Sequence, residues 1–258
     1  FFDEHKIASI YKGDNIFKPK LIISNDQFIT KENYTLLKEK IKNNLGYTIK
    51  EAFKEQTINI KTNNQNLKAI IFSLQENLGI IKISEVRQFF KSLMPDDLIV
   101  LKEKNLKIST NFIYYDPAAF NKRNKDIRWI LVNLFMKKKY LKILPNKKIF
   151  LNKNKISKLA LSAIGLIKLE NFAIEISFLE YIFDLFLSEK KEVYHFNFYH
   201  IRKLNISFEA FYEVLKYYKF KKIAGTSFLT YWKKIEEPFY IKKQYDKTNP
   251  FYILKKLQ

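Results

Sequence analysis

Glycine is scarce in this chain, and its distribution limits the kinds of loop that the sequence can form. Only five of the 258 residues are glycine, at positions 13, 46, 79, 165 and 225, and no two of them lie close together. Loops that hold nucleotide phosphates present clustered backbone N–H groups and are rich in glycine. The chain also lacks a GxxxxGKS/T motif, and Asp3-Glu4-His5 lacks the residue that a DExH box has between Glu and His. We therefore predict no ATP-binding site in this segment.

The remaining reactive side chains do not have the spacing of a metal or catalytic site. The chain has no cysteine, which excludes disulfides, thiolate metal sites and cysteine nucleophiles. His195 and His200 are five residues apart and would not share one face of a helix. Asp96 and Asp97 follow a proline, and their expected role is at the positive end of a helix. We therefore predict no catalytic residue, no metal site and no cofactor in this segment.

The charge of the chain favours a polyanionic partner. The formal net charge is +21 and the isoelectric point is about 9.7, which is typical of nucleic-acid-binding proteins. The alternative is compositional bias, because lysine outnumbers arginine, which occurs only at positions 87, 123, 128 and 202. Bias explains the choice of lysine over arginine more readily than it explains the excess of lysine and arginine over Asp and Glu. An arginine retained in such a chain indicates either bidentate recognition or an internal ion pair.

Hydropathy favours a globular chain outside the membrane. Hydrophobic residues make up 47% and aromatic residues 16% of the sequence, unlike a disordered chain. The uncharged apolar stretch 159–167 is far too short to span a bilayer, and acids interrupt the apolar residues of 172–187. We expect no membrane partner and a cytoplasmic location. Because the chain begins at Phe1, without methionine or a signal peptide, we expect an internal or C-terminal fragment of a longer protein.

The apolar periodicity predicts an α+β fold, mostly helical with small β-sheets, in three parts. Residues 1–60 are expected to form a β-hairpin, with strands at 7–11 and 16–23, and a helix capped by Thr30. Residues 61–140 are expected to form a helical subdomain with short strands. Its predicted elements are helices at 67–78, from Ser84 to 93 and from Pro95 onward, a strand at 107–115, and a long helix from Asp116 to about 138.

The third predicted part, residues 141–258, follows a lysine- and asparagine-rich boundary at 139–155. It is expected to be a second helical subdomain, with a helix at 156–164 capped by Gly165, a short strand pair and a helix at 176–187. Residues 198–204 form a predicted short helix, Asn205-Ile206 a turn, and Ser207 the cap of a helix at 208–218. Strands at 220–223 and 227–232 follow. Helix, turn, helix and hairpin are the layout of a winged helix, here about 195–233, and a basic tail follows.

This winged-helix-like unit combines cations with planar side chains. A nucleic-acid surface needs cations to hold phosphates and aromatic rings to stack on bases. The candidate nucleic-acid-binding residues are Arg202, Lys203, Lys216, Tyr217, Lys219, Lys221 and Lys222. The alternative is that Tyr217 or Tyr218 and Phe220 belong to the core, while the lysines only solvate the surface.

Five stretches, taken in order, resemble one protein family. The residues Ile7-Ala8-Ser9-Ile10, Gly13-Asp14 and Lys18-Pro19-Lys20-Leu21 resemble its ARL…GDD…LKPRV segment, and residues 67–79 resemble its LRAIAFRLVENLG helix. Residues 98–117 resemble RRALRKLGVRFGAFHIYLPAL, 163–185 resemble AVGYR…AVRVDILERLADL, and 202–218 resemble its final helix-turn-helix. The similarity, over most of residues 5–233, is to the C-terminal region of the alphaproteobacterial superfamily 2 DExH helicases related to the mitochondrial degradosome RNA helicase.

The resemblance implies a role within a larger enzyme. The family's two motor domains, which bind ATP and Mg, would precede Phe1, and its catalytic residues match nothing in this chain. The chain departs from the family at Lys122, near a second proline of the family, at Leu166, where the family has tyrosine, and at Asn205, where it has glycine. These departures do not break the expected fold, but they argue against transferring the family's individual residue contacts to this chain.

We therefore expect a C-terminal accessory region of an ATP-dependent RNA helicase. Its expected partners are nucleic acid, with single-stranded RNA as the first candidate, the helicase motor domains and, as a further candidate, a nuclease. One alternative is a stand-alone winged-helix protein that binds duplex DNA. The other is a protein-interaction scaffold without affinity for nucleic acid.

Overall fold

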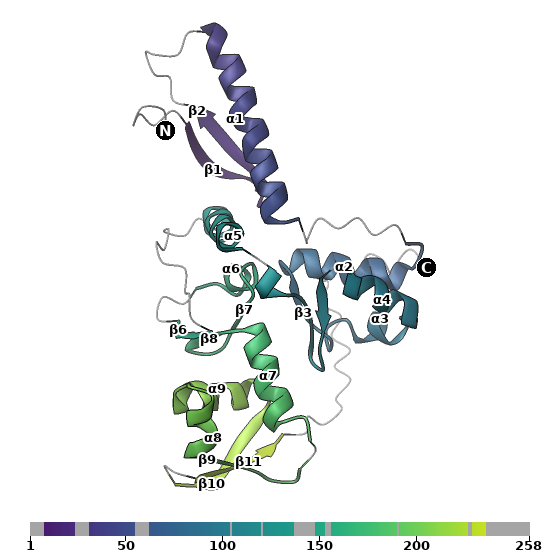
Figure 1. Cartoon of the computed structure of the whole chain (residues 1–258), viewed down its shortest axis with the longest axis vertical. Coiled ribbons are helices and arrows are strands. Elements are labelled where there is room, and N and C mark those ends of the chain that lie inside the picture. The colour runs from purple at the N-terminus through teal and green to yellow at the C-terminus, as the bar shows by residue number, and fades with distance from the viewer. Residues whose placement is uncertain are drawn as a thin grey trace. The chain divides into compact units, whose positions relative to one another are not determined.

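The computed structural model describes residues 8–23, 31–54, 62–103, 105–119, 121–136, 148–152, 156–189, 191–226 and 229–235. They belong to two compact units. The first unit lies within Phe1–Lys190 and Ile206–Val214, and the second within Lys191–Asn205 and Leu215–Gln258. Helices alternate with small antiparallel sheets (Figure 1), which confirms the α+β class.

The first described element is the predicted β-hairpin. Strands β1 (Ala8–Asn15) and β2 (Lys18–Ile23) pair antiparallel, and helix α1 (Lys31–Ala52) follows. The predicted cap Thr30 lies outside the described residues. Gly46 does not interrupt the helix. Ile49 and Ala52 in the last turn of α1 and the adjacent Phe53 are buried, and they pack with α5 and α6 in one apolar core.

The next elements form a three-stranded sheet covered by helices. They are α2 (Gln65–Glu76), β3 (Ile80–Lys82), α3 (Arg87–Lys91), α4 (Pro95–Glu103), β4 (Leu106–Ile108) and β5 (Phe112–Tyr115). The strand order is β3-β5-β4, and buried side chains of α2, α4 and the three strands make a second core. Pro95 opens α4, as predicted, with Asp96 and Asp97 in the first turn.

Three expectations in this region are wrong. The predicted strand 107–115 is a hairpin that reverses at Ser109–Asn111, because Ser109 and Phe112 close a tight turn through an N–H to O bond of 2.9 Å. Ser84 does not cap a helix, since α3 starts after Val86 without a side-chain cap. Asp116 does not start the long helix either.

Residues Pro117–Ala119 form a separate 3-10 turn, in which the Asp116 side chain accepts the N–H of Ala118 at 3.0 Å. Helix α5 (Lys122–Phe135) then begins after Asn121, whose side chain accepts the N–H of Asn124 at 2.7 Å. The local cap therefore decides where this helix starts.

A second three-stranded sheet repeats the arrangement of the first. Its elements after α5 are β6 (Ile149–Leu151), α6 (Lys158–Ser162), β7 (Leu166–Lys168) and β8 (Phe172–Glu175), and helix α7 (Ile176–Phe186) follows. The strand order is β6-β8-β7. Strand β6 lies in the stretch expected to be only a boundary, most of which is outside the described residues. Helix α6 is shorter than the predicted helix 156–164, and its C-cap is Ala163 rather than Gly165, which follows two residues later with φ at +84°.

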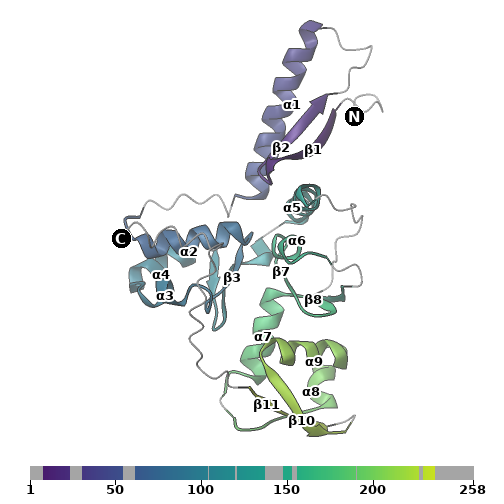
Figure 2. The same ribbon diagram turned by 180° about the vertical axis from the view of Figure 1, so that it is seen from behind.

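The last elements follow the same order once more. They are β9 (Tyr194–Asn197), α8 (Phe198–Lys203), α9 (Phe208–Tyr217), β10 (Phe220–Gly225) and β11 (Leu229–Lys234). The third sheet has the order β10-β11-β9, and Figure 2 shows its strands and the adjacent helices. In all three sheets the third strand in sequence therefore lies between the first and the second.

The three hairpins also share one turn register. In each, the N–H of the first turn residue donates to the carbonyl of the fourth. The bonds are Ser109 to Phe112 at 2.9 Å, Leu169 to Phe172 at 2.9 Å and Thr226 to Leu229 at 2.8 Å. A helix–strand–helix–hairpin motif thus occurs three times in the described residues. The sequence predicted the short helices and the hairpin of the last copy, but neither its first strand nor the recurrence.

The buried side chain of Arg128 connects three helices of the first unit, α1, α5 and α6. Arg128 of α5 is fully buried, and its Nε donates to the carbonyl of Ala52 while Nη1 donates to that of Ala163, at 3.4 Å for the latter. The guanidinium lies 4.9 Å from the centre of the Phe53 ring. Both carbonyls end helices, where partial negative charge accumulates. This retained arginine therefore has a structural role.

Candidate nucleic-acid interface

The second unit has an unusually one-sided charge. Its described residues include nine lysines and arginines but a single acidic residue, Glu192. The cations are Lys191, Arg202, Lys203, Lys216, Lys219, Lys221, Lys222, Lys233 and Lys234. All seven residues predicted to bind nucleic acid lie in this unit. The excess is stronger in this unit than in the first: over their full sequence ranges, the second unit has 14 lysines and arginines against 4 acids, and the first has 33 against 22.

The third sheet separates a buried face from a cationic face. Phe220, Trp232 and Thr230 point into the core, where the Trp232 Nε1 donates to the Thr230 hydroxyl at 3.0 Å. Side chains alternate between the faces of a sheet, and directly opposite residues lie on the same face. Lys221 of β10 is opposite Lys233 of β11, on the face away from this core.

An exposed aromatic ring lies on the same face of the sheet. Tyr231 precedes Lys233 by two residues on β11 and is opposite His195 of β9. We name the set Lys221, Tyr231 and Lys233 the outer strand face; all three side chains are exposed. Like charges directly opposite each other destabilise a strand pair. A polyanion between Lys221 and Lys233 would remove that repulsion.

Helix α8 carries a smaller group of the same kind. Arg202 and Lys203 are exposed in its last turn, three and four residues after Tyr199, which is 71% exposed. Residues at these spacings share one face of a helix. His200 has a different role, since it completes a capping box with Asn197, whose side chain accepts the His200 N–H at 3.1 Å.

The residues at the end of α9 are partly structural. Tyr217 is half-buried, and its ring meets the edge of the buried Tyr218 ring at a centroid distance of 5.6 Å. Lys219 has φ at +65° and ends the helix through an N–H bond to the Lys216 carbonyl. Phe220 is buried. Tyr218 and Phe220 are therefore core residues, as the alternative interpretation of this segment expected. The lysines of the segment are exposed, at positions 216, 219, 221 and 222.

Sequence reasoning missed Tyr199, Tyr231 and Lys233. The signal for the two on β11 was the alternation over residues 230–233, in which Thr230 and Trp232 are buried while Tyr231 and Lys233 are exposed. The signal for Tyr199 was its three- and four-residue spacing to Arg202 and Lys203. Neither could be used before the faces of the elements were known.

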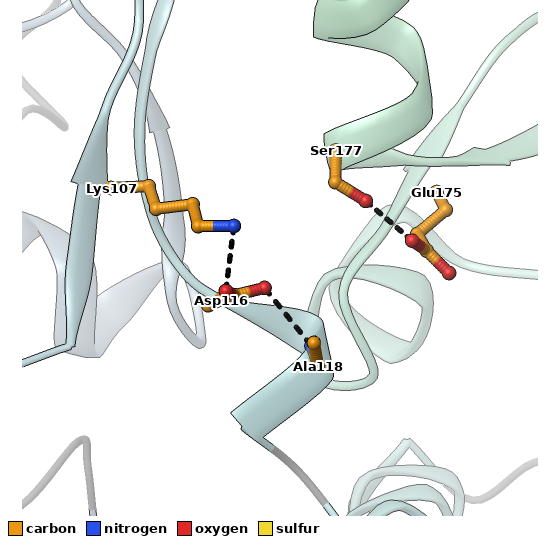
Figure 3. Close-up of polar contacts among 5 residues, drawn as sticks. All are labelled: Lys107, Asp116, Ala118, Glu175 and Ser177. Carbon is orange, nitrogen blue, oxygen red and sulfur yellow. Dashed lines mark hydrogen bonds and ion pairs between the residues drawn. The ribbon is translucent and has the colours of Figure 1, made fainter.

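Carboxylates gather at the first sheet instead. Tyr114 of β5 is buried, and burial, reinforced by the charges of Glu180, Asp116, Asp184 and Glu175, raises the pKa of its hydroxyl to about 12. Figure 3 shows two of these acids in local contacts: Asp116 pairs with Lys107 at 2.6 Å, and Glu175 accepts the Ser177 hydroxyl. Phosphates would be repelled from this region of the first unit.

The raised pKa of Tyr114 predicts a specific loss of stability in alkali. The unfolded tyrosine ionises near 10 and the folded one at about 12, so the stabilisation is complete below about pH 10 and disappears as the pH rises through about 12. We expect the urea midpoint to fall more between about pH 9 and about pH 11 in the wild type than in Tyr114→Phe. Equal falls in both proteins would contradict this origin of the pKa shift.

The described residues contain neither a metal-binding group nor a membrane-spanning helix. Within the described ranges, no three His, Cys, Asp or Glu side chains are close enough together to hold a metal ion. No helix among the same residues is both long and apolar enough to cross a bilayer. No family model matches the chain, and neither a curated protein nor a solved structure matches it.

Proposed function

We propose that this chain is the nucleic-acid-binding C-terminal accessory region of an ATP-dependent superfamily 2 RNA helicase, whose motor domains bind ATP and Mg. The main support for the proposal is the charge of the second unit, whose described residues include nine lysines and arginines and one acid. The ordered resemblance of residues 5–233 to the helicase family supports the link to a motor. The second unit would guide the strand, and the motor domains would supply the energy.

Single-stranded RNA fits this surface better than a duplex does. Exposed rings bind unpaired bases by stacking, while flanking cations hold the phosphates. Tyr231 lies two residues from Lys233, which is opposite Lys221, on the outer strand face, and Tyr199 precedes Arg202 and Lys203 on α8. In this proposal β9, α8, α9, β10 and β11 form a winged helix whose hairpin contacts the strand. The rings would contribute about 1–3 kcal/mol for each stacked base.

The test compares two pairs of charge reversals of equal size. In Lys221→Glu/Lys233→Glu the outer strand face becomes acidic. In the control, Lys68→Glu/Lys122→Glu, two exposed lysines in the first turns of α2 and α5 are reversed, where acids suit the helix dipole. Binding of fluorescent single-stranded RNA and of duplex DNA is measured across salt concentrations for both variants and the wild type.

We expect the outer-face variant to lose about a hundredfold in RNA affinity and the control to lose less than threefold. Each lost phosphate contact should reduce the slope of log affinity against log salt by about 0.7 for a single strand, so the slope should fall by about 1.4. Equal losses in both variants would contradict a localised site. Tighter binding of duplex DNA would favour a stand-alone DNA-binding protein, and no binding at low salt would favour a protein-interaction scaffold.

A further inference from the structure

The turn of the second hairpin is held by a glutamate from a later helix. Glu213 of α9 is buried, and its carboxylate accepts the backbone N–H of Asn171 at 2.9 Å, the Asn171 side-chain amide at 2.7 Å and the N–H of Phe172 at 3.2 Å. These donors form the tip of the β7–β8 turn. A buried carboxylate with this many partners is a strong, directional anchor.

The first hairpin is held in the same way. Glu180 of α7 is buried, and it accepts the backbone N–H of Asn111 at 3.4 Å and the side-chain amide of Asn111 at 3.2 Å. Asn111 and Asn171 occupy the same position, the third residue of the shared turn register. We name each pair, Glu180 with Asn111 and Glu213 with Asn171, a clasp.

The third hairpin lacks the residue that a clasp needs. In the sequence, Thr226 and Leu229 flank Ser227-Phe228, where the first two turns have Thr110-Asn111 and Glu170-Asn171. Phenylalanine has no side-chain amide to donate to a carboxylate. The pattern of the first two hairpins therefore cannot be repeated at the third.

We infer that the three motifs have divided their roles: the first two hairpins are internal connectors that exclude nucleic acid, and only the third, β10–β11, contacts the RNA strand. This inference rests on the proposed function and specifies which of three equivalent hairpins performs it. The clasps occupy the N–H groups at the first two tips, and each places a carboxylate there. A phosphate would have to displace that carboxylate and would be repelled by it.

The charges around the hairpins agree with this division. The first hairpin belongs to the sheet whose Tyr114 is influenced by four carboxylates, and its Lys107 is already paired with Asp116. The third hairpin carries Lys221, Lys222, Lys233 and Lys234. The chain should therefore present one hairpin-sized contact to a strand rather than three.

The experiment reverses equal charge on the different hairpins of the full chain. Lys107→Glu/Lys168→Glu alters the first two hairpins, and Lys221→Glu/Lys233→Glu alters the third. We expect the first pair to change the RNA affinity less than threefold, as Lys68→Glu/Lys122→Glu should, and the second pair to lower it about a hundredfold. Hydrogen exchange with bound RNA should slow in residues 191–205 and 215–235, but not in 106–115 or 166–175.

The outcomes separate this inference from the proposed function. If RNA binds and Lys107→Glu/Lys168→Glu weakens it as much as the third-hairpin variant does, the division of roles is overturned while the nucleic-acid function stands. If the wild type does not bind RNA at low salt, both fall. Hydrogen exchange without RNA serves as the folding check, because variants that retain the wild-type protection of residues 166–175 have kept the clasp.

Discussion

Replacing Arg128 with methionine should lower the free energy of unfolding of the first unit by about 3 kcal/mol. Methionine preserves much of the volume but donates no hydrogen bond to the carbonyls of Ala52 and Ala163. Each buried polar group left without a partner costs about 1–3 kcal/mol, and the contact between the guanidinium and Phe53 is lost as well. Urea unfolding followed by circular dichroism measures the change.

Arg123 provides the matched control on the same helix. It lies on α5 but is exposed, so Arg123→Met should change the stability by less than about 0.5 kcal/mol. Similar losses in the two variants would mean that the buried hydrogen bonds of Arg128 do not hold the ends of α1 and α6 in place. A large loss only in Arg128→Met would support that role.

Replacing Gly165 with alanine should destabilise the first unit by a similar amount, about 3 kcal/mol. Gly165 has φ at +84°, which costs an L-residue about 1–2 kcal/mol. A Cβ there would also lie 2.6 Å from Cγ and 2.7 Å from Cβ of Pro117, and overpacking of this kind costs about 1–3 kcal/mol. Thermal unfolding should show a midpoint lower by about 6–12 °C.

Gly46→Ala is the matched control, and it should change the unfolding midpoint in the opposite direction. Gly46 lies within α1, and a Cβ at this position would meet no atom within 4 Å. Because alanine favours a helix over glycine by up to about 1 kcal/mol, Gly46→Ala should raise the midpoint. Stabilisation by both alanines, or destabilisation by both, would contradict the distinction between the two backbone positions.

Local signals in the sequence were sufficient for several elements. Pro95 with two acids predicted the start of α4, and Ser207 predicted that of α9, where its hydroxyl accepts the N–H of Ala210 at 3.2 Å. The hairpin of β1 and β2 was also predicted. In each case the residues that stabilise the element lie within it or next to it.

The first strand of each three-stranded sheet could not be predicted in the same way. Strands β3, β6 and β9 have only three or four residues, and each pairs with a strand that comes much later in the chain. Such short segments have too few residues for alternation to be recognised. Without these strands the threefold recurrence of the motif was not visible either.

The candidate interface was predicted by composition rather than by geometry. The lysines around β10 were found because four of them fall within the seven residues 216–222, and they lie on the surface of one unit. Tyr231 and Lys233 were not found, because their shared face with Lys221 depends on the strand register. The clasps could not be foreseen, since Glu180 and Glu213 lie 69 and 42 residues from the asparagines that they hold.

The separation of these partners along the chain also imposes an order on events at the ribosome. Asn111 leaves the exit tunnel well before Glu180, and at about 5–20 residues per second the delay is roughly 3–14 s. During that interval the backbone N–H and the side-chain amide of Asn111 lack the Glu180 carboxylate that accepts them in the folded chain. The corresponding delay for the second hairpin is shorter, because Asn171 and Glu213 are only 42 residues apart in the sequence. The clasp of the first hairpin would therefore form only after the second motif, which ends at Glu175, has been made.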